Sequence, residues 1–204
     1  MVGPRTSPDK TTRPAQLTLP RFTPLGQAQK TRQVSLNEEM SMLVDVFGNP
    51  LVEGAEPAGP AAAKLGSMDG AGNPLVKAWM DAITENPKLG ATEVWEIFNF
   101  TADAHPIHVH QTMFQVVNRQ ALDNLDAEGI AVPPAFPIGL KRGPESWESG
   151  YKDTVIAYPG EITRVKAKFD NPGLFVWHCH LVEHEDNEMM RRYFIGEMPN
   201  NLGQ

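Results

Sequence analysis

All six histidines of the chain fall in two short segments, and this clustering limits the possible folds more than any other feature. The first segment reads HPIHVH at residues 105–110, and the second reads HCH at residues 178–180, followed by His184. Clusters of histidine and cysteine are typical of metal sites. We therefore expect a fold that brings these two distant segments together around metal.

Each segment reads as a β-strand that can serve two centres. On a strand, alternate side chains share a face, so His178 and His180 point to one side and Cys179 to the other. His108 and His110 share a face in the same way, while His105, three residues earlier, can turn toward the other centre. The covalent bonds of the HCH tripeptide would join the two centres and offer a route for electrons.

The spacing after the cysteine indicates a copper site. His184 follows Cys179 by five residues and Met189 follows it by ten, so a folded-back segment can place both beside the sulfur. Together with His105, they offer two imidazoles, a thiolate and a weak axial thioether, the set that suits blue copper and electron transfer. Zinc also accepts cysteine and histidine, but the methionine and the interleaved histidines favour copper. Cys179 is the sole cysteine, so it forms no intramolecular disulfide.

From residue 92 onward the apolar pattern is that of strands. We expect strands at residues 92–100, 113–117, 154–158, 162–169 and 174–182, with turns at Pro159-Gly160 and at residues 171–173. Within residues 162–169, Val165, Ala167 and Phe169 alternate with Arg164, Lys166 and Lys168. This alternation predicts a strand with one face in water, and the whole series predicts an antiparallel sandwich.

The other segments are predicted to be connections. Residues 1–24 carry five prolines and read as an extended linker or arm. Residues 54–74, rich in Gly, Ala and Pro, read as a mobile loop, and residues 121–150 as a long surface loop. After Asn73-Pro74, the apolar residues Val76, Trp79, Met80 and Ile83 recur at helical spacing and predict a short helix in a connecting loop.

Net charge and the absence of long apolar stretches limit the kinds of partner that the chain is expected to bind. The formal net charge of -7 argues against a nucleic-acid surface, because phosphate binding needs clustered Lys and Arg. No stretch approaches the roughly 20 apolar residues that span a bilayer, and the first residues lack the apolar core of a secretory signal. Small molecules, metals or other proteins are the expected partners. The compartment stays unassigned.

Three stretches together carry a family resemblance. HPIHVH at residues 105–110, WESGYKDTVIAYPGE at 147–161 and HCHLVEHEDNEMM at 178–190 closely resemble multicopper oxidases of the bacterial spore-coat laccase, bilirubin oxidase and phenoxazinone synthase type. The resemblance implies an all-β fold, a Greek-key cupredoxin sandwich or barrel over residues 25–198, with a tail at 199–204. It implies the third and last cupredoxin domain of an enzyme that oxidises phenolic or similar substrates and reduces dioxygen to water.

The resemblance also implies a role for each metal-binding residue. The type 1 copper ligands fall on His105, Cys179, His184 and Met189, with Met190 as the rival axial ligand. His108 corresponds to a type 2 ligand, and His110, His178 and His180 correspond to type 3 ligands of the trinuclear cluster. Glu185 resembles the acid that passes protons toward oxygen; the alternatives are a carboxylate that accepts a hydrogen bond from a ligand and a charge that is only solvated.

One departure from the family is expected to matter. The family's cluster takes eight histidines, half of them from two His-x-His motifs of the first domain, and this chain holds no such pair beyond those already assigned. Only four histidines remain for the cluster once His105 and His184 bind type 1 copper. The rest would come from missing cupredoxin domains or from a second copy of this chain. The alternative is a stand-alone copper-binding or electron-transfer cupredoxin without oxidase activity.

Overall fold

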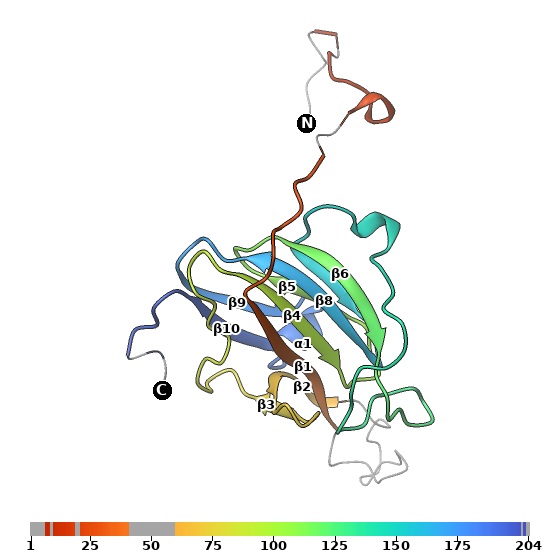
Figure 1. Ribbon diagram of the computed structural model, residues 1–204, viewed down its shortest axis with the longest axis vertical. Helices are drawn as coiled ribbons and strands as arrows, with labels where there is room; N and C mark the ends of the chain where they lie inside the picture. The colour runs from red at the N-terminus through yellow and green to blue at the C-terminus, as the bar shows by residue number, and fades with distance from the viewer. Residues whose placement is uncertain (1–6, 9, 19–20, 41–59, 201, 203–204) are drawn as a thin grey trace.

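Two packed β-sheets form the body of the protein in the computed structural model, which describes all residues except 1–6, 9, 19–20, 41–59, 201 and 203–204 (Figure 1). The six-stranded sheet has the order β3 (Pro74–Lys77), β2 (Pro60–Met68), β1 (Lys30–Met40), β4 (Thr92–Asn99), β8 (Glu161–Lys168) and β6 (Phe114–Ala121). The four-stranded sheet has the order β10 (Met190–Ile195), β9 (Gly173–Cys179), β5 (His105–Val109) and β7 (Thr154–Ala157). The remaining elements are short: 3₁₀ helices η1 (Pro14–Gln16) and η2 (Ser146–Glu148), and helix α1 (Val182–Glu185).

This architecture confirms the predicted all-β sandwich of the cupredoxin type. β1 pairs in parallel with β4, whereas all the other ladders are antiparallel. The facing sides of the two sheets enclose an apolar core in which Trp95 of β4 stacks on Phe169 and meets Trp177 of β9 edge-on, with ring centroids 5.7 Å apart in both pairs. All three rings are buried. The core therefore packs the four-stranded sheet, which contains β5 and β9, against the six-stranded sheet.

The first half of the chain differs from the sequence prediction. β1 and β2 were not predicted, and the whole of β2 lies within the expected mobile loop at 54–74, of which residues 54–59 fall outside the described residues. The expected helix around Val76–Ile83 is wrong, since β3 ends at Lys77 and a turn follows. Val76 lies on β3, whose backbone completes an antiparallel ladder with β2, so this segment is extended and not helical.

β8 confirms the predicted alternation with one exception. Val165, Ala167 and Phe169 are buried, whereas Lys168 is exposed. Arg164, on the face expected to be wet, is also buried. Its guanidinium lies 2.6 Å from a carboxylate oxygen of Glu96 and also donates to side-chain amide oxygens of β6, so its charge is paired with polar partners.

The long excursion after β6 folds back onto the sandwich. Isolated bridges tie it to neighbouring segments, for example Arg119 with Arg142 and Leu122 with Pro137. Arg119 is fully buried and donates two hydrogen bonds, of 2.7 and 2.6 Å, to the carboxylate of Glu148 in η2. The expected surface loop is thus anchored by a buried ion pair.

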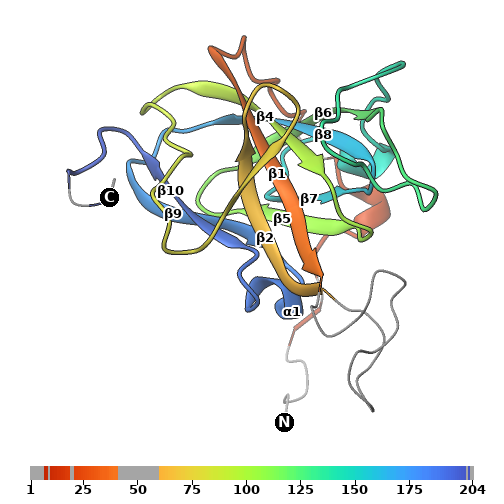
Figure 2. The ribbon, with the colours of Figure 1, turned by 90° about the horizontal axis from the view of Figure 1, so that it is seen from below.

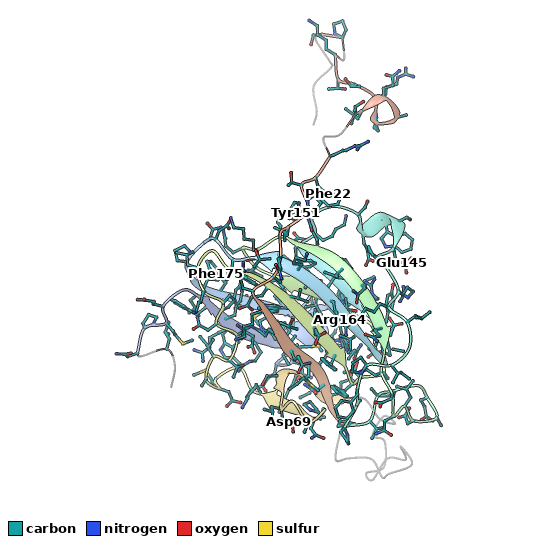
Figure 3. All side chains as sticks on the ribbon, in the orientation of Figure 1. Phe22, Asp69, Glu145, Tyr151, Arg164 and Phe175 are labelled. Atoms are coloured by element: carbon teal, nitrogen blue, oxygen red, sulfur yellow. The ribbon has the colours of Figure 1, made fainter. Side chains whose placement is uncertain are left out.

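The proline-rich N-terminal segment projects from one end of the sandwich. The described residues between 7 and 18 extend away from the two sheets (Figure 1). Phe22 lies edge-on against Tyr151, and the Tyr151 hydroxyl donates a 3.0 Å hydrogen bond to the carbonyl of Thr23 (Figure 3). In the described part of the chain, no helix is long and apolar enough to cross a membrane.

Candidate metal centre

The sole cysteine lies between two histidines that approach it from different elements. Cys179 ends β9, and His105 begins β5, the antiparallel neighbour in which Ile107 pairs with Cys179. The Cys179 Sγ atom is 3.6 Å from Nδ1 of His105 and 3.8 Å from Nδ1 of His184, and the two Nδ1 atoms are 3.1 Å apart. All three donor atoms lie within 4.8 Å of one another. One metal ion could contact all of them.

The segment after Cys179 closes by backbone hydrogen bonds. The amide of Cys179 donates to the carbonyl of Met189 at 3.0 Å, and the amide of Met189 donates to the carbonyl of His184 at 2.9 Å. Met189 is fully buried, whereas Met190 is half-buried at the start of β10. These hydrogen bonds place the backbone of the fourth candidate ligand, Met189, next to the backbone of Cys179.

The expected strand over residues 174–182 is wrong at its end. β9 stops at Cys179, and α1 begins at Val182 at one end of the sandwich, next to β2 and β9 (Figure 2). The amides of His184 and Glu185 both donate to the carbonyl of Leu181. A helical turn therefore shortens the path, so that His184 reaches the cysteine only five residues after it.

Burial disfavours the charged forms of His105 and Cys179. Burial, followed by the neighbouring charge of His184, lowers the pKa of His105 to about 4. Burial raises the pKa of the Cys179 thiol to about 11. The same low-polarity surroundings thus favour neutral groups, as expected for desolvated sites. A cation would compensate for this desolvation, because it stabilises the thiolate directly.

The donor set fits copper. Among the described residues, the only hydrogen-bonding contacts of His105 Nδ1 are His184 Nδ1 and Cys179 Sγ, which are themselves donor atoms of the group. A hydrogen on one of the two Nδ1 atoms can be shared with the other, whereas a cation in its place would take a lone pair from both nitrogens and from the thiolate. Two imidazoles and a thiolate with a buried methionine suit copper better than zinc.

The other four histidines form a second group on the opposite side of β5 and β9. Nε2 of His110 lies 3.0 Å from Nε2 of His178, and the ring of His108 lies 4.8 Å from that of His110 and 5.4 Å from that of His178, centroid to centroid. The ring of His180 is 5.7 Å from that of His108. Ligand atoms of His108, His110 and His178 could hold a metal ion together. His110 and His180 are exposed, so this group opens onto the surface.

Hydrogen bonds orient the rings of the second group. Nδ1 of His108 lies 2.8 Å from the carbonyl of Asp153, and Nδ1 of His178 lies 2.9 Å from the carbonyl of Cys179. Since carbonyls only accept, both Nδ1 atoms carry the hydrogen, and both Nε2 atoms keep their lone pairs. For His110, burial and the charges of neighbouring histidines lower the pKa. The group is therefore ready to bind cations through nitrogen lone pairs.

Glu185 contacts the second group. Its Oε2 lies 3.2 Å from Nδ1 of His178, the ring nitrogen that faces away from His110. Since the hydrogen on this Nδ1 is donated to the carbonyl of Cys179, Glu185 acts on the ring through its charge at close range and not through a hydrogen bond of its own.

The fold is that of a cupredoxin domain, and it carries two adjoining groups of candidate metal ligands. The chain belongs to the multicopper oxidase family, because the model of that family, described as "Multicopper oxidase", matches residues 56–198. Copper is the cofactor of this family.

Named relatives agree with this assignment. The chain is 42% identical over 133 residues to a laccase of Bacillus stratosphericus, an alignment that covers 62% of this chain and 25% of the relative. It is 42% identical over 139 residues to a laccase of Bacillus subtilis, with the same shares covered. It is 35% identical over 135 residues to multicopper oxidase LPR1 of Arabidopsis thaliana, covering 53% of this chain and 23% of that protein. The chain thus spans about a quarter of the length of these relatives.

Solved structures share the fold. A multicopper oxidase from Campylobacter jejuni, described as a metallo-oxidase, superposes with a TM-score of 0.55 at 22% identity, over 89% of this chain and 34% of that one. The McoA multicopper oxidase of Aquifex aeolicus superposes with a TM-score of 0.56 at 20% identity, over 88% and 32%.

Sequence reasoning missed the residues that surround the ligands. Thr101 Oγ1 lies 2.6 Å from Nε2 of His105, and Glu38 Oε1 lies 3.9 Å from the same atom. Thr101 stands four residues before His105, close enough that its spacing could have suggested a contact. Glu38 lies on β1, a strand that the sequence pattern did not predict, so no local signal pointed to it.

Proposed function

We propose that this chain is the third cupredoxin domain of a laccase-like oxidase and that it binds a type 1 copper through His105, Cys179, His184 and Met189. The observation that carries the proposal is the convergence of the three donor atoms of His105, Cys179 and His184 within 4.8 Å, in a site where burial disfavours bare charge. The family membership of the chain supports the same metal.

We further propose that the second histidine group forms half of a trinuclear cluster. His108 would supply a type 2 ligand, and His110, His178 and His180 would supply type 3 ligands. Copper at the two centres would supply one-electron transfer from a phenolic or similar reductant and the reduction of dioxygen to water. The protein's own part is to hold Cys179 between His178 and His180, so that only a few covalent bonds separate the two centres.

Glu185 is proposed to handle protons at the second group. Dioxygen reduction to water consumes protons, and a carboxylate 3.2 Å from His178 Nδ1, about a quarter exposed, can exchange protons with solvent. Its negative charge beside Nδ1 would also favour the ring orientation that directs Nε2 at the cluster. Both roles need the same position of the carboxylate.

Four histidines are half of what the family's cluster requires. The missing ligands are proposed to come from further cupredoxin domains or from a second copy of this chain, which would meet the exposed faces of His110 and His180. The relatives' greater length supports the first source, since about three quarters of each laccase relative lies outside the match.

A second function has one observation in its favour. One chain brings together the donor atoms of His105, Cys179 and His184, whereas the second group is open on one side. A domain with these properties could transfer electrons without reducing oxygen. Reversible oxidation and reduction at a single copper per chain, without oxygen consumption at any protein concentration, would support this alternative.

Copper stoichiometry and oxygen uptake test the proposal together. The chain is loaded with copper, and bound copper, visible absorption, molar mass and oxygen uptake with 2,6-dimethoxyphenol are measured across a dilution series. We expect an intense thiolate-to-copper band at every concentration and no uptake by the monomer. Uptake that follows dimer formation would assign the missing ligands to a second chain. Absence of the band, or rapid uptake by a monomer with a single copper, would contradict the proposal.

A further inference from the structure

The ring of His105 is held at both nitrogens. Nδ1 faces Cys179 and His184, and Nε2 lies 2.6 Å from Oγ1 of Thr101. His105 and Thr101 are both fully buried or nearly so, at 0% and 1% exposure, so no water competes for these contacts. A neutral imidazole carries one hydrogen, and its location decides whether Nδ1 has a lone pair for a metal.

Asn99 determines which way the Thr101 hydroxyl points. The Asn99 Nδ2 atom donates to the carbonyls of Asp103 and Ala157, at 2.8 and 3.1 Å. Its Oδ1 accepts from the backbone amide of Thr101 at 2.9 Å. In the reverse amide orientation, Oδ1 would face the two carbonyl oxygens and Nδ2 would face the amide hydrogen of Thr101. The hydrogen-bond network therefore selects the orientation in which Nδ2 donates to those carbonyls.

The hydroxyl of Thr101 is consequently committed as a donor. Its single hydrogen goes to Asn99 Oδ1 at 2.9 Å, and the nearby carbonyl of Asp103, at 3.1 Å, is the other acceptor in reach. In either case a lone pair of Oγ1 is left for Nε2 of His105, which must then carry the hydrogen. If Thr101 donated to His105 instead, the ring hydrogen would sit on Nδ1 and point into the donor set.

A charge on the same side gives independent support. Oε1 of Glu38 lies 3.9 Å from Nε2 of His105, and this side chain is 11% exposed. Among the described residues, that oxygen has no hydrogen-bond partner. A partly desolvated carboxylate oxygen favours an N–H over a lone pair at the nearest ring nitrogen.

We propose that Thr101, oriented by Asn99, is a positioning residue that fixes His105 as the Nε2–H tautomer and keeps the Nδ1 lone pair directed at Cys179 and His184. The consequence for metal binding rests on the proposed type 1 site, but the tautomer itself belongs to the metal-free protein. The two can therefore be tested separately.

The first experiment reads the tautomer directly. Long-range ¹H–¹⁵N correlation spectra of the metal-free, ¹⁵N-labelled chain at pH 7 distinguish the two neutral tautomers, and His105→Phe identifies the His105 signals. We expect the Nε2–H pattern in the wild type and in Thr101→Ser, which keeps the hydroxyl. Thr101→Val, of nearly equal shape, should show a mixture of tautomers. An Nδ1–H pattern in the wild type would overturn the proposal.

The second experiment measures affinity for Co²⁺ alone, which cannot oxidise the thiol as Cu²⁺ can. Removing a group that orients a metal-binding histidine costs about 10- to 100-fold in affinity. We expect a loss of this size at the cysteine site in Thr101→Val and near wild-type affinity in Thr101→Ser. Thr163→Val is the matched control, because Thr163 is buried on β8 and its hydroxyl has no partner among the described residues.

The outcomes separate this inference from the proposed function. If Thr101→Val keeps both the wild-type tautomer and the wild-type affinity, or if Thr163→Val loses as much affinity, Thr101 has no positioning role. If the wild type takes up no Co²⁺ at Cys179 but the tautomers change as expected, the proposed metal site fails and the assignment of Thr101 stands.

Discussion

The sulfur of Cys179 lies 3.6 Å from Nδ1 of His105, although 74 positions separate the two residues. The β5–β9 ladder creates this contact, because it places Ile107 opposite Cys179. Helix α1, which follows Cys179 in the sequence, then places Nδ1 of His184 3.8 Å from the same sulfur. The type 1 candidate site therefore depends on strand pairing as much as on the ligands themselves.

Cys179→Ser should abolish the colour of the copper-loaded chain. The thiolate is the ligand that gives blue copper its intense charge-transfer band, and a serine hydroxyl does not replace it. Visible absorption and metal analysis of the variant test this. If the band persisted at wild-type intensity, Cys179 would not be the equatorial ligand.

Met189→Leu should keep the blue colour and raise the reduction potential. A weak axial thioether tunes the potential more than it retains the metal, and its removal favours reduced copper. Met190→Leu is the control, since Met190 begins β10 and pairs with His178 through its backbone. Potentiometric titration distinguishes the two. A shift confined to Met190→Leu would move the axial role to that residue.

Glu185→Gln should weaken metal binding at the second histidine group by about 10-fold and leave the thiolate band unchanged. The negative charge of the carboxylate lies 3.2 Å from His178 Nδ1, and a neutral amide at that place supports the ring less strongly. Glu183→Gln, on the same helix and exposed, should bind like the wild type. Copper titration followed by metal analysis measures both. Equal affinities in the two variants would leave Glu185 without a role in orienting His178.

Glu148→Gln should lower the free energy of unfolding by about 3 kcal/mol, because it leaves the buried guanidinium of Arg119 without its anion. Urea denaturation at pH 7 measures the loss. Asp170→Asn, which breaks an exposed pair with Lys168, should change stability by no more than about 0.5 kcal/mol. Similar losses in both variants would mean that the Arg119–Glu148 pair does not anchor the excursion after β6.

The same pair predicts a pH dependence. The hydrogen bonds from Arg119 hold the pKa of Glu148 below its usual 4.5. Its contribution to stability is therefore complete above pH 4.5 and is lost as the pH falls through the lower pKa of the folded state. Wild-type stability should drop more steeply than that of Glu148→Gln below pH 4.5, as followed by urea denaturation at a series of pH values. Parallel curves would contradict the depressed pKa.

Much of the site could be predicted from local sequence. Alternation on a strand sends neighbouring side chains to opposite faces, so the HCH tripeptide alone implied that Cys179 and His178 serve different centres. The same two-residue period predicted the later strands, including the burial of Val165 and Phe169. These features are local, because the geometry of a single strand determines them.

The tertiary structure alone decided what depends on residues far apart in the chain. β1 forms through pairing with β2 and β4, and β2 through pairing with β1 and β3; the local sequence pattern did not reveal either strand. Arg164 is buried because Glu96 on the adjacent strand covers its charge. Glu38 of β1 reaches His105 only once β1 and β4 lie side by side. Pairing between distant segments creates these contacts, and no spacing within one segment encodes them.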